Sequence, residues 1–529
     1  MGELSASDHS VTPPALTIPR AFNAAHDLIE RNLRAGRRSK VAYIDDGGTY
    51  TYADLAMRVN RCANSLRQLG LQMEQRVLLC MHDSIDWPTA FLGTIKAGIV
   101  PVAVNTFLTT ADYRHMLHDS RARALIVSAP LLSVFAPLLG ESPFLQHVIV
   151  AGGHASEHLA FSKILQAAQT SFDAAPTTCD DMCFWLYSSG STGVPKGTIH
   201  VHSSLIQTAE LYARPVLGIR ESDVVFSAPK LFFAYGLGNA LTFPMSVGAT
   251  TVLMAERPTP DAVFSRLTAH RPSIFYGVPT LYAAMLASPN LPHRGACNLR
   301  ACVSAGEALP EEIGRRWTQH FDVDILDGIG STEMLHIFLS NRPSDVQYGT
   351  TGLPVPGYDL RIVDEEEREV PAGQIGDLQV RGPTCALNYW NNRDKSRATF
   401  QGYWARTGDK YLVNERGRYI YAGRSDDMLK VSGMYVSPIE VESALISHDA
   451  VLEAAVIGRP DSDGLIKPLA YVVLKPGFAR SPDLAETLKH HVKSRLAHFK
   501  YPRWIEFIAE LPKTATGKIQ RFKLRERQR

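Results

Sequence analysis

A loop rich in glycine and hydroxyl side chains carries the strongest chemical signal in the sequence. It runs from Tyr187 to Gly197, directly after the apolar run Phe184–Leu186, and it contains one lysine, Lys196. Backbone N–H groups, hydroxyls and a cation suit phosphate oxygens, so we predict a polyphosphate-binding loop. The usual P-loop pattern does not fit, because Pro195 precedes and Gly197 follows the lysine, where a helix should begin. Taken alone, the segment has a flexible surface loop as its alternative.

A second cluster runs from Asp327 to Glu333 and also follows an apolar run. It brings together two glycines, two hydroxyl side chains and the Glu333 carboxylate. Glycine allows a ligand to approach the backbone closely, and a carboxylate beside phosphate oxygens suits a hard cation such as Mg²⁺. The alternative for this segment alone is a helix start capped by Ser331.

Four further segments are weak singly and informative together. Each could be a turn or a solvated charge on its own, whereas their joint order is far less expected by chance. They are Trp404–Asp409, Tyr421–Arg424, Lys430–Pro438 and Pro512–Arg521.

With these motifs, the sequence from around Ala25 to its end resembles the adenylate-forming superfamily of acyl-CoA synthetases, luciferases and peptide-synthetase adenylation domains. Within it, the chain is most similar to the bacterial benzoate-CoA ligases, through Ser227–Gly238 and Gly328–Ile337. The resemblance implies an acid–thiol ligase of aromatic degradation. Such an enzyme joins benzoate to ATP as benzoyl-adenylate, and CoA then displaces AMP to give benzoyl-CoA. The cofactors implied are ATP, Mg²⁺ and CoA.

The resemblance also assigns the ATP-binding residues. Catalytic roles fall to Lys518, Glu333 and Thr332: Lys518 would bridge carboxylate and α-phosphate, Thr332 would touch the α-phosphate, and Glu333 would hold the metal. The phosphate loop would comprise Ser188, Ser189, Gly190, Ser191, Thr192, Gly193 and Lys196. The adenine would be lined by Ser304, Ala305, Gly306, Glu307, Asp327, Gly328 and Ile329, and the ribose would be held by Asp409 with Arg424 nearby. Further cofactor-binding residues would be Gly330, Ser331 and Tyr421. A carboxylate such as that of Asp409 can accept from both ribose hydroxyls.

For the second half-reaction, the resemblance implies that a small domain rotates about Asp426. This motion would remove Lys518 and bring Lys430 and Gly433 to the site, with Gly433 beside the pantetheine of CoA. Lys518 would also be a plausible acetylation target, since acetylation removes its charge.

The acyl pocket implied by the same resemblance has small residues that leave room for a flat ring and larger ones that close its edges. Its members would be Phe233, Ala234, Tyr235, Gly328, Ile329, Gly330, His336 and Ile337. His336 could meet the substrate or be a satisfied core histidine. Two alternatives stay open: a ligase for a substituted aryl or small non-aromatic acid, and a non-catalytic nucleotide-binding protein, which would need neither Lys518 nor Glu333.

The elements that must position these residues follow from the apolar pattern. Apolar runs rich in β-branched residues alternate with helical patterns, which predicts parallel sheets covered by helices. From Gly352 the strands become shorter and glycine-punctuated, which indicates an antiparallel subdomain. Beyond Asp427, a helix over Pro438–Ser447, capped by Ser437, opens a small α+β unit. Its other elements are predicted over Val451–Ile457, Leu469–Leu474, Pro482–Leu496 and Trp504–Phe507.

With 529 residues the chain is too long for one core. We therefore predict an α/β and α+β multidomain fold. Its large N-terminal domain (1–425) would bind ATP and the acyl group and include the β-rich subdomain, and its small C-terminal catalytic domain (426–529) would be mobile.

Composition limits the partners. A net charge of +2 offers no broad basic surface for nucleic acid, and polar and glycine residues interrupt the uncharged stretch 231–255, so we expect neither nucleic acid nor membrane as partner. Seven scattered cysteines and the lack of an apolar leader favour a cytoplasmic protein with reduced thiols. Partners should be aryl carboxylate, ATP and CoA. A homodimer and a lysine acetyltransferase or deacetylase acting on Lys518 are further partners that the resemblance admits.

Overall fold

The computed structural model describes residues 3–153, 157–189, 195–425, 427–431, 434–462, 465–513 and 519–528. The side chains of Ser189, Lys430, Met434 and Tyr435 are outside this description. Seven predicted site residues fall outside it altogether: Gly190, Ser191, Thr192, Gly193, Asp426, Gly433 and Lys518.

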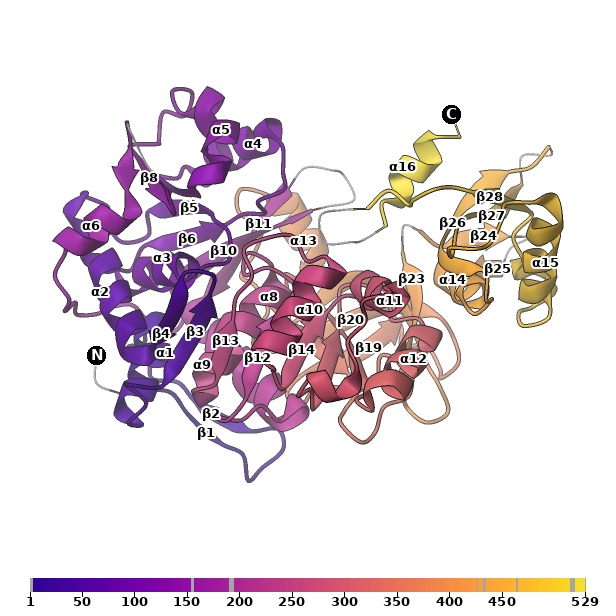
Figure 1. Ribbon diagram of the computed structural model, residues 1–529, viewed down its shortest axis with the longest axis horizontal. Helices are drawn as coiled ribbons and strands as arrows, with labels where there is room; N and C mark the ends of the chain where they lie inside the picture. The colour runs from indigo at the N-terminus through magenta and orange to yellow at the C-terminus, as the bar shows by residue number, and fades with distance from the viewer. Residues whose placement is uncertain are drawn as a thin grey trace.

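The first layered sheet has seven strands in the order β11-β10-β6-β5-β7-β8-β9 (Figure 1). Its strands are parallel except for the β10–β11 hairpin at one edge. The central strand residues are buried apolar runs, as expected for a sheet covered on both faces. The strand bounds are β5 Arg76–Cys80, β6 Val100–Ala103, β7 Ala124–Ser128, β8 His147–Ala151, β9 Leu159–Ala160, β10 Met182–Ser189 and β11 Pro195–Val201.

The second layered sheet has nine strands in the order β18-β17-β16-β15-β14-β12-β13-β3-β4. Strands β3, β13, β12, β14, β15 and β16 run parallel, and antiparallel strands close both edges. The bounds are β3 Val41–Asp45, β4 Gly48–Thr51, β12 Val224–Ser227, β13 Thr250–Val252, β14 Ile274–Gly277, β15 Ala301–Ser304, β16 Ile325–Gly330, β17 Ile337–Ser340 and β18 Leu353–Pro354.

Helices connect the strands of both sheets. Several begin with the capping chemistry expected from their sequence: Thr51 and Asp54 form a reciprocal capping box at the start of α2. Helical bounds are α1 Ala24–Arg34, α2 Tyr52–Gln68, α3 Asp86–Lys96, α4 Thr110–Ser120, α5 Leu132–Phe135, α6 Phe161–Ala167, α7 His202–Thr208, α8 Ala234–Leu237, α9 Phe243–Val247, α10 Pro260–Ala269, α11 Pro279–Ala287 and α12 Glu311–Phe321. Two π-helices, η3 Ala209–Leu217 and η4 Gly238–Thr242, follow α7 and α8, and short 3₁₀ turns occupy Ala129–Leu131, Ala136–Leu138 and Arg294–Ala296.

The stretch after Gly352 forms the predicted antiparallel sheet. Its strands are β19 Asp359–Val363, β20 Gly376–Arg381, β21 Phe400–Gln401, β22 Trp404–Val413 and β23 Tyr419–Arg424, with α13 Arg393–Thr399 before β21. Strand β22 pairs with β20, β21 and β23. The sheet therefore carries both Asp409 and Arg424 on adjacent strands.

The C-terminal unit has its own apolar core. In Figure 1 it lies at the far end of the molecule, with its last segment running back toward the larger part. Its elements are β24 Leu429–Val431, β25 Met434–Val436, α14 Pro438–Ile446, β26 Val451–Pro460, β27 Ile466–Leu474, α15 Pro482–Lys493, the 3₁₀ turn His498–Lys500, β28 Trp504–Phe507 and α16 Arg521–Glu526. Ser437 caps α14 as predicted, since its side chain accepts from the N–H of Glu440 at 3.2 Å. Helix α15 ends at Lys493, three residues earlier than predicted.

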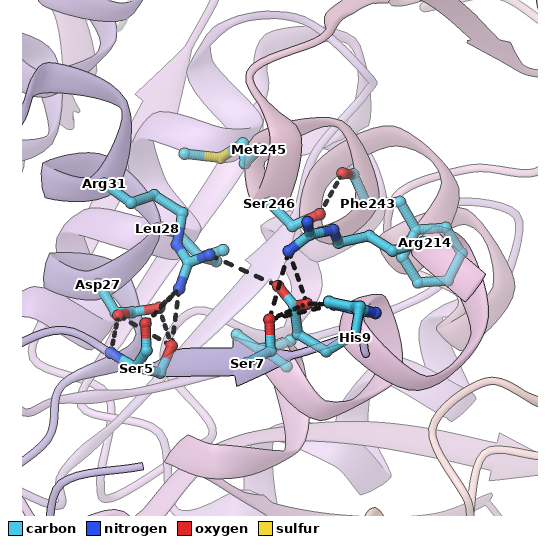
Figure 2. Close-up of polar contacts among 12 residues, drawn as sticks. Ser5, Ser7, His9, Asp27, Leu28, Arg31, Arg214, Phe243, Met245 and Ser246 are labelled. Atoms are coloured by element: carbon cyan, nitrogen blue, oxygen red, sulfur yellow. Dashed lines mark hydrogen bonds and ion pairs between the residues drawn. The ribbon is translucent and has the colours of Figure 1, made fainter. Parts of the chain in front are cut away.

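The N-terminal hairpin is tied to the large domain by a polar cluster. This hairpin pairs β1 Ala6–Asp8 with β2 Ala15–Thr17. Buried Glu210 accepts hydrogen bonds from Ser7 Oγ at 2.7 Å, His9 Nε2 at 2.7 Å and Arg214 at 2.9 Å. Arg31 Nη1 lies 3.6 Å from the other carboxylate oxygen of Glu210, and Figure 2 shows the side chains of Ser7, His9, Arg31 and Arg214 pointing toward one another. The first residues of the chain thereby anchor η3, the π-helix that carries Tyr212.

No helix in the described ranges is long and apolar enough to cross a membrane. The uncharged stretch 231–255 instead folds as α8, η4, α9 and β13, which is the buried helix and strand expected from its glycines and proline.

Candidate functional site

The predicted phosphate-binding and metal-binding residues meet at the ends of two strands, β10 in the seven-stranded sheet and β16 in the nine-stranded sheet. Ser188 Oγ donates to Glu333 Oε1 at 3.4 Å, which joins the two sheets. Tyr389 OH donates to the same oxygen at 2.8 Å. The Lys196 ammonium lies 4.2 Å from the centre of the Tyr389 ring, so cation, ring and carboxylate form one group.

Charge in this group is balanced between burial and attraction. Burial lowers the pKa of Lys196, the Glu333 carboxylate opposes that shift, and Lys395 and Arg424 add to it. Among the described residues, the charges that act on Lys196 are two cations and one carboxylate, so its ammonium would gain strongly from a polyanionic ligand. Tyr389 escaped the sequence analysis, because no motif singled it out and only the tertiary fold brings it to Glu333.

Thr332 is positioned through its backbone. His200 Nε2–H donates to the Thr332 carbonyl at 2.8 Å, and the His200 ring stacks on Phe184. Burial lowers the pKa of His200 to about 4, so this imidazole is neutral near pH 7. A neutral histidine orients Thr332 without adding positive charge, and His200 is a second residue that sequence reasoning missed. Ser331, the predicted helix cap, accepts from the N–H of Met334 at 3.1 Å but caps a turn and no helix.

The predicted adenine residues lie side by side because β15 and β16 are parallel neighbours. Ser304 is in register with Asp327, and Ala305, Gly306 and Glu307 continue from β15. Gly306 has φ +97°, a left-handed conformation that favours glycine. Ser304 Oγ and Asp327 Oδ1 are buried, and neither has a hydrogen-bond partner among the described residues. Burial raises the pKa of Asp327 well above its usual value.

Asp409 and Arg424 form the predicted pair on the antiparallel sheet. Arg424 donates to Asp409 Oδ1 at 3.1 Å and to the Thr407 carbonyl at 3.0 Å. Gly408 between these partners has φ +73°, and a Cβ there would stand 2.7 Å from the Arg424 guanidinium, so the turn needs glycine. Tyr421 lies beside Asp409, and its pKa is raised well above the ordinary value, chiefly by burial and then by that carboxylate.

His336 is the centre of the predicted acyl pocket and is enclosed by aromatic rings. Its centroid lies 5.5 Å from that of Tyr235, 4.4 Å from Phe243 and 5.7 Å from Tyr212. Its Nε2–H donates to the Tyr235 carbonyl at 3.1 Å, with Asn239 Oδ1 at 3.2 Å. Burial lowers the pKa of His336 to about 3, so the ring is neutral.

Two glycines beside His336 and Ile337 stand where a side chain would collide with its neighbours. A Cβ on Gly328 would stand 3.2 Å from Ile337 Cδ1, and a Cβ on Gly330 would stand 2.4 Å from the His336 carbonyl oxygen. Ile329, Phe233, Ala234 and Tyr235 are half-buried and Ile337 is fully buried. The structure therefore brings Tyr235 and the two glycines next to His336 or Ile337, and Phe233 and Ala234 precede Tyr235 at the start of α8. Tyr212, Asn239 and Phe243 were missed, because they lie in η3, η4 and α9 outside the stretches that carried the resemblance, Asn239 by a single residue.

The segment beside Lys518 reaches the large domain. The N–H of Ile519 donates to Glu307 Oε1 at 3.0 Å, across 212 positions of sequence. Lys513 and Ile519 form a bridge at the base of the intervening segment, and Lys513 pairs with Glu453. Lys518 itself, like Asp426, Gly433 and the loop residues 190–193, lies outside the described residues, and only the backbone of Lys430 is described, in β24.

Magnesium fits this site as an ion shared with a ligand. In the described part of the chain no three His, Cys, Asp or Glu side chains gather as a metal cage. Glu333 is one carboxylate beside a phosphate-type loop, and Mg²⁺ is commonly held by one or two carboxylates together with substrate phosphates.

Comparison with known protein families agrees with this fold and site. The AMP-binding enzyme family matches residues 29–390, and the AMP-binding enzyme C-terminal domain matches residues 440–518. The chain therefore belongs to the AMP-binding enzyme family.

Individual relatives are similar over nearly their whole length. The benzoate–CoA ligase of Thauera aromatica is 66% identical over 99% of this chain and 100% of its own. The 4-hydroxybenzoate–CoA/benzoate–CoA ligase of Rhodopseudomonas palustris is 49% identical over 96% of this chain and 94% of its own. Among solved structures, a benzoate CoA ligase from Burkholderia xenovorans LB400 is similar with a TM-score of 0.90 and 59% identity, covering 95% of this chain and 100% of that one.

Proposed function

We propose that the chain is an ATP-dependent acid–thiol ligase that converts benzoate and CoA to benzoyl-CoA, AMP and pyrophosphate through benzoyl-adenylate. The observation that carries the proposal is the 66% identity to a benzoate–CoA ligase over the full length of both chains. The ring-lined surroundings of neutral His336 support an aromatic acyl group, because rings pack favourably on rings in a dry site. A non-catalytic nucleotide binder explains neither feature.

The chemistry asks the protein to align two anions and to stabilise charge. A carboxylate has no good leaving group, and adenylation supplies AMP as one. We propose that the loop from Ser188 to Lys196 holds the β- and γ-phosphates, and that Thr332 touches the α-phosphate. Glu333 would hold Mg²⁺, which neutralises phosphate charge, and Lys518 would bridge carboxylate and α-phosphate. Such preorganised charges act where solvent is excluded and therefore count for more than in water.

We assign nucleotide recognition to the same residues that the motifs indicated. Asp409, held by Arg424, would accept from the ribose hydroxyls, and the segment from Ser304 to Glu307 would flank adenine opposite Asp327. The orphaned Ser304 Oγ and Asp327 Oδ1 support a polar ligand there, since buried polar atoms normally find partners.

A change of orientation between the large domain and the C-terminal unit would serve the second half-reaction. We propose residues 426–529 as the mobile unit with Asp426 as its hinge, and Lys430 and Gly433 as the residues that meet CoA after rotation. The Glu307–Ile519 hydrogen bond supports the first orientation, because it holds the neighbour of Lys518 against the predicted adenine segment. A cytoplasmic location, a homodimer and acetylation of Lys518 stay predictions.

The second candidate is a ligase for a substituted aryl acid. A relative at 49% identity is named for both 4-hydroxybenzoate and benzoate, which favours this alternative over a small non-aromatic acid.

Acid-dependent pyrophosphate–ATP exchange tests the proposal. The full chain is assayed with benzoate, 4-hydroxybenzoate, 2-aminobenzoate and hexanoate, followed by thioester formation with CoA. Benzoate should give the highest kcat/KM. Preference for 4-hydroxybenzoate or 2-aminobenzoate would select the second candidate, and no exchange with any acid would refute both.

A further inference from the structure

Helix α4 contacts both strands that flank the predicted phosphate loop. Strand β10 leads into the loop and β11 leads out of it, with Tyr187 in register with Gly197 and Ser189 with Pro195. Tyr187 OH donates to Asp119 Oδ2 at 2.7 Å, and His115 Nε2–H donates to the Pro195 carbonyl at 3.2 Å. Because His115 and Asp119 are four residues apart, one face of α4 holds one residue of each strand.

Trp390 makes hydrogen bonds both to α4 and to β11. Its indole N–H donates to the Asp119 carbonyl at 2.9 Å, and its backbone N–H donates to the Gly197 carbonyl at 2.8 Å. Cations flank its ring, with the Arg76 guanidinium 5.3 Å and that of Arg121 5.7 Å from the centroid. The base of the hairpin is thus clamped by hydrogen bonds to α4 and to Trp390.

The position of the hairpin in the sheet gives this clamp a purpose. Strand β11 is the last strand of the seven-stranded sheet, and its outer edge pairs with Leu387–Trp390 through backbone hydrogen bonds at Ile199 and Gly197. Pro195 lies two residues nearer the loop than Gly197, and its carbonyl accepts from His115. A loop that must place several donors around a polyphosphate binds more weakly if its ends are not fixed, because part of the binding free energy is then lost in ordering the loop. Tyr187 directly precedes the predicted loop Ser188–Lys196, and Pro195 lies near its other end.

We propose that His115 and Asp119 are positioning residues for the phosphates of ATP, acting through Pro195 and Tyr187. By fixing both ends of the loop they set the affinity for ATP and pyrophosphate. Benzoyl-adenylate and CoA carry no phosphate that this loop would hold, so the second half-reaction does not depend on them. The inference rests on the proposed function, since it takes the segment 188–196 as the ATP phosphate loop.

The test compares both half-reactions in the full-length protein. In His115→Ala and Asp119→Leu, the KM for ATP in benzoate-dependent exchange should rise about five- to twentyfold. This is the effect expected from the loss of one hydrogen bond, and the bond to the Asp119 carboxylate belongs at the upper end of that range because a charged group takes part in it. The rate of thioester formation from supplied benzoyl-adenylate and CoA should stay within about twofold. His115→Gln and Asp119→Asn keep a donor and an acceptor, and they should recover most of the ATP affinity.

Tyr113→Phe is the matched control. Tyr113 OH on the same helix donates to the Asn105 carbonyl at 2.7 Å, a bond as long as that from Tyr187 to Asp119 but to a residue outside β10 and β11. Its loss should leave the KM for ATP unchanged. If Asp119→Leu does not fold, Tyr187→Phe removes the same hydrogen bond by deleting a single oxygen.

Two results would overturn the inference. One is an unchanged KM for ATP in His115→Ala and Tyr187→Phe. The other is an equal slowing of both half-reactions together with a lower melting temperature, which marks a purely structural role. A wild-type protein that shows no acid-dependent exchange instead refutes the proposed function, so the two failures are distinguishable.

Discussion

His336 and Glu333 lie within four residues of each other in sequence, yet the side chains that surround them differ in chemical character. Around His336 the contacts are rings, a neutral imidazole and glycines that leave no room for an extra carbon. Around Glu333 the contacts are a lysine, a tyrosine hydroxyl and a serine hydroxyl at the junction of two sheets. We expect the first environment to select the acid by shape and the second to stabilise charge on the phosphates.

This difference teaches where mutations should act. Removing a charge at the proposed phosphate side should change the rate for every acid alike, because all acids share the ATP chemistry. Changing volume at the proposed acyl side should alter which acid is used and leave the ATP chemistry intact. The predictions below test that separation.

The largest effect is expected for Lys518→Ala. Loss of a preorganised cation should slow adenylation at least ~100-fold while sparing thioester formation from supplied benzoyl-adenylate. Lys513→Ala is the matched control, since Lys513 pairs with Glu453 on the same segment, and it should stay near wild type. Single-turnover assays of each half-reaction measure both. Equal losses in the two half-reactions would show that Lys518 does not serve adenylation alone.

Glu307→Ala should slow adenylation about tenfold, through loss of the charge-assisted hydrogen bond to the Ile519 N–H. Thioester formation from benzoyl-adenylate should change much less, because the proposed rotation would place the C-terminal unit in another orientation. Glu307→Gln retains an acceptor oxygen and should recover most of the adenylation rate. A raised KM for ATP with no difference between the half-reactions would instead assign Glu307 to adenine binding.

At the acyl side, Ile337→Ala and Gly328→Ala should have opposite consequences. The first removes carbon beside Gly328 and should improve 4-methylbenzoate relative to benzoate about tenfold, whereas the second adds carbon 3.2 Å from Ile337 and should disfavour it. The comparison is the ratio of kcat/KM for the two acids. If this ratio changed in the same direction in Ile337→Ala and in Gly328→Ala, the contact between the two residues would not border the substrate.

The smallest effect is a pH dependence of stability. His336 is neutral in the fold with a pKa of about 3, while an unfolded histidine titrates near 6.5. Below pH 6.5 the unfolded state binds a proton that the folded state does not, so stability falls as pH falls, by about 1 kcal/mol at pH 5.5. His336→Gln keeps a donor and removes the titration.

Its free energy of unfolding should therefore decline less between pH 7 and 5.5 than that of the wild type. Urea titrations at the two pH values measure the difference. An equal decline of the free energy of unfolding in the wild type and in His336→Gln would show that His336 takes up its proton in the folded protein as readily as in the unfolded one.

Local chemistry in the sequence determined a large part of this protein. The glycine–hydroxyl loop, the Asp327–Glu333 cluster and the Thr-Gly-Asp turn are contiguous, so their backbone freedom and donor groups are written in neighbouring letters. The alternation of apolar runs likewise predicted layered parallel sheets, because strands buried on both faces need continuous apolar sequence. Together these features identified the family, which the comparisons confirm.

Only the tertiary structure decided which distant residues complete the site. Tyr389 meets Glu333 from 56 positions away, and Asp119 meets Tyr187 from 68 positions away. Tyr212 and Phe243 enclose His336 from helices that carry no motif. A sequence pattern records what one segment can do locally, whereas these contacts depend on how sheets and helices pack. Packing is set by the sum of many weak apolar contacts, and no short stretch of residues displays that sum.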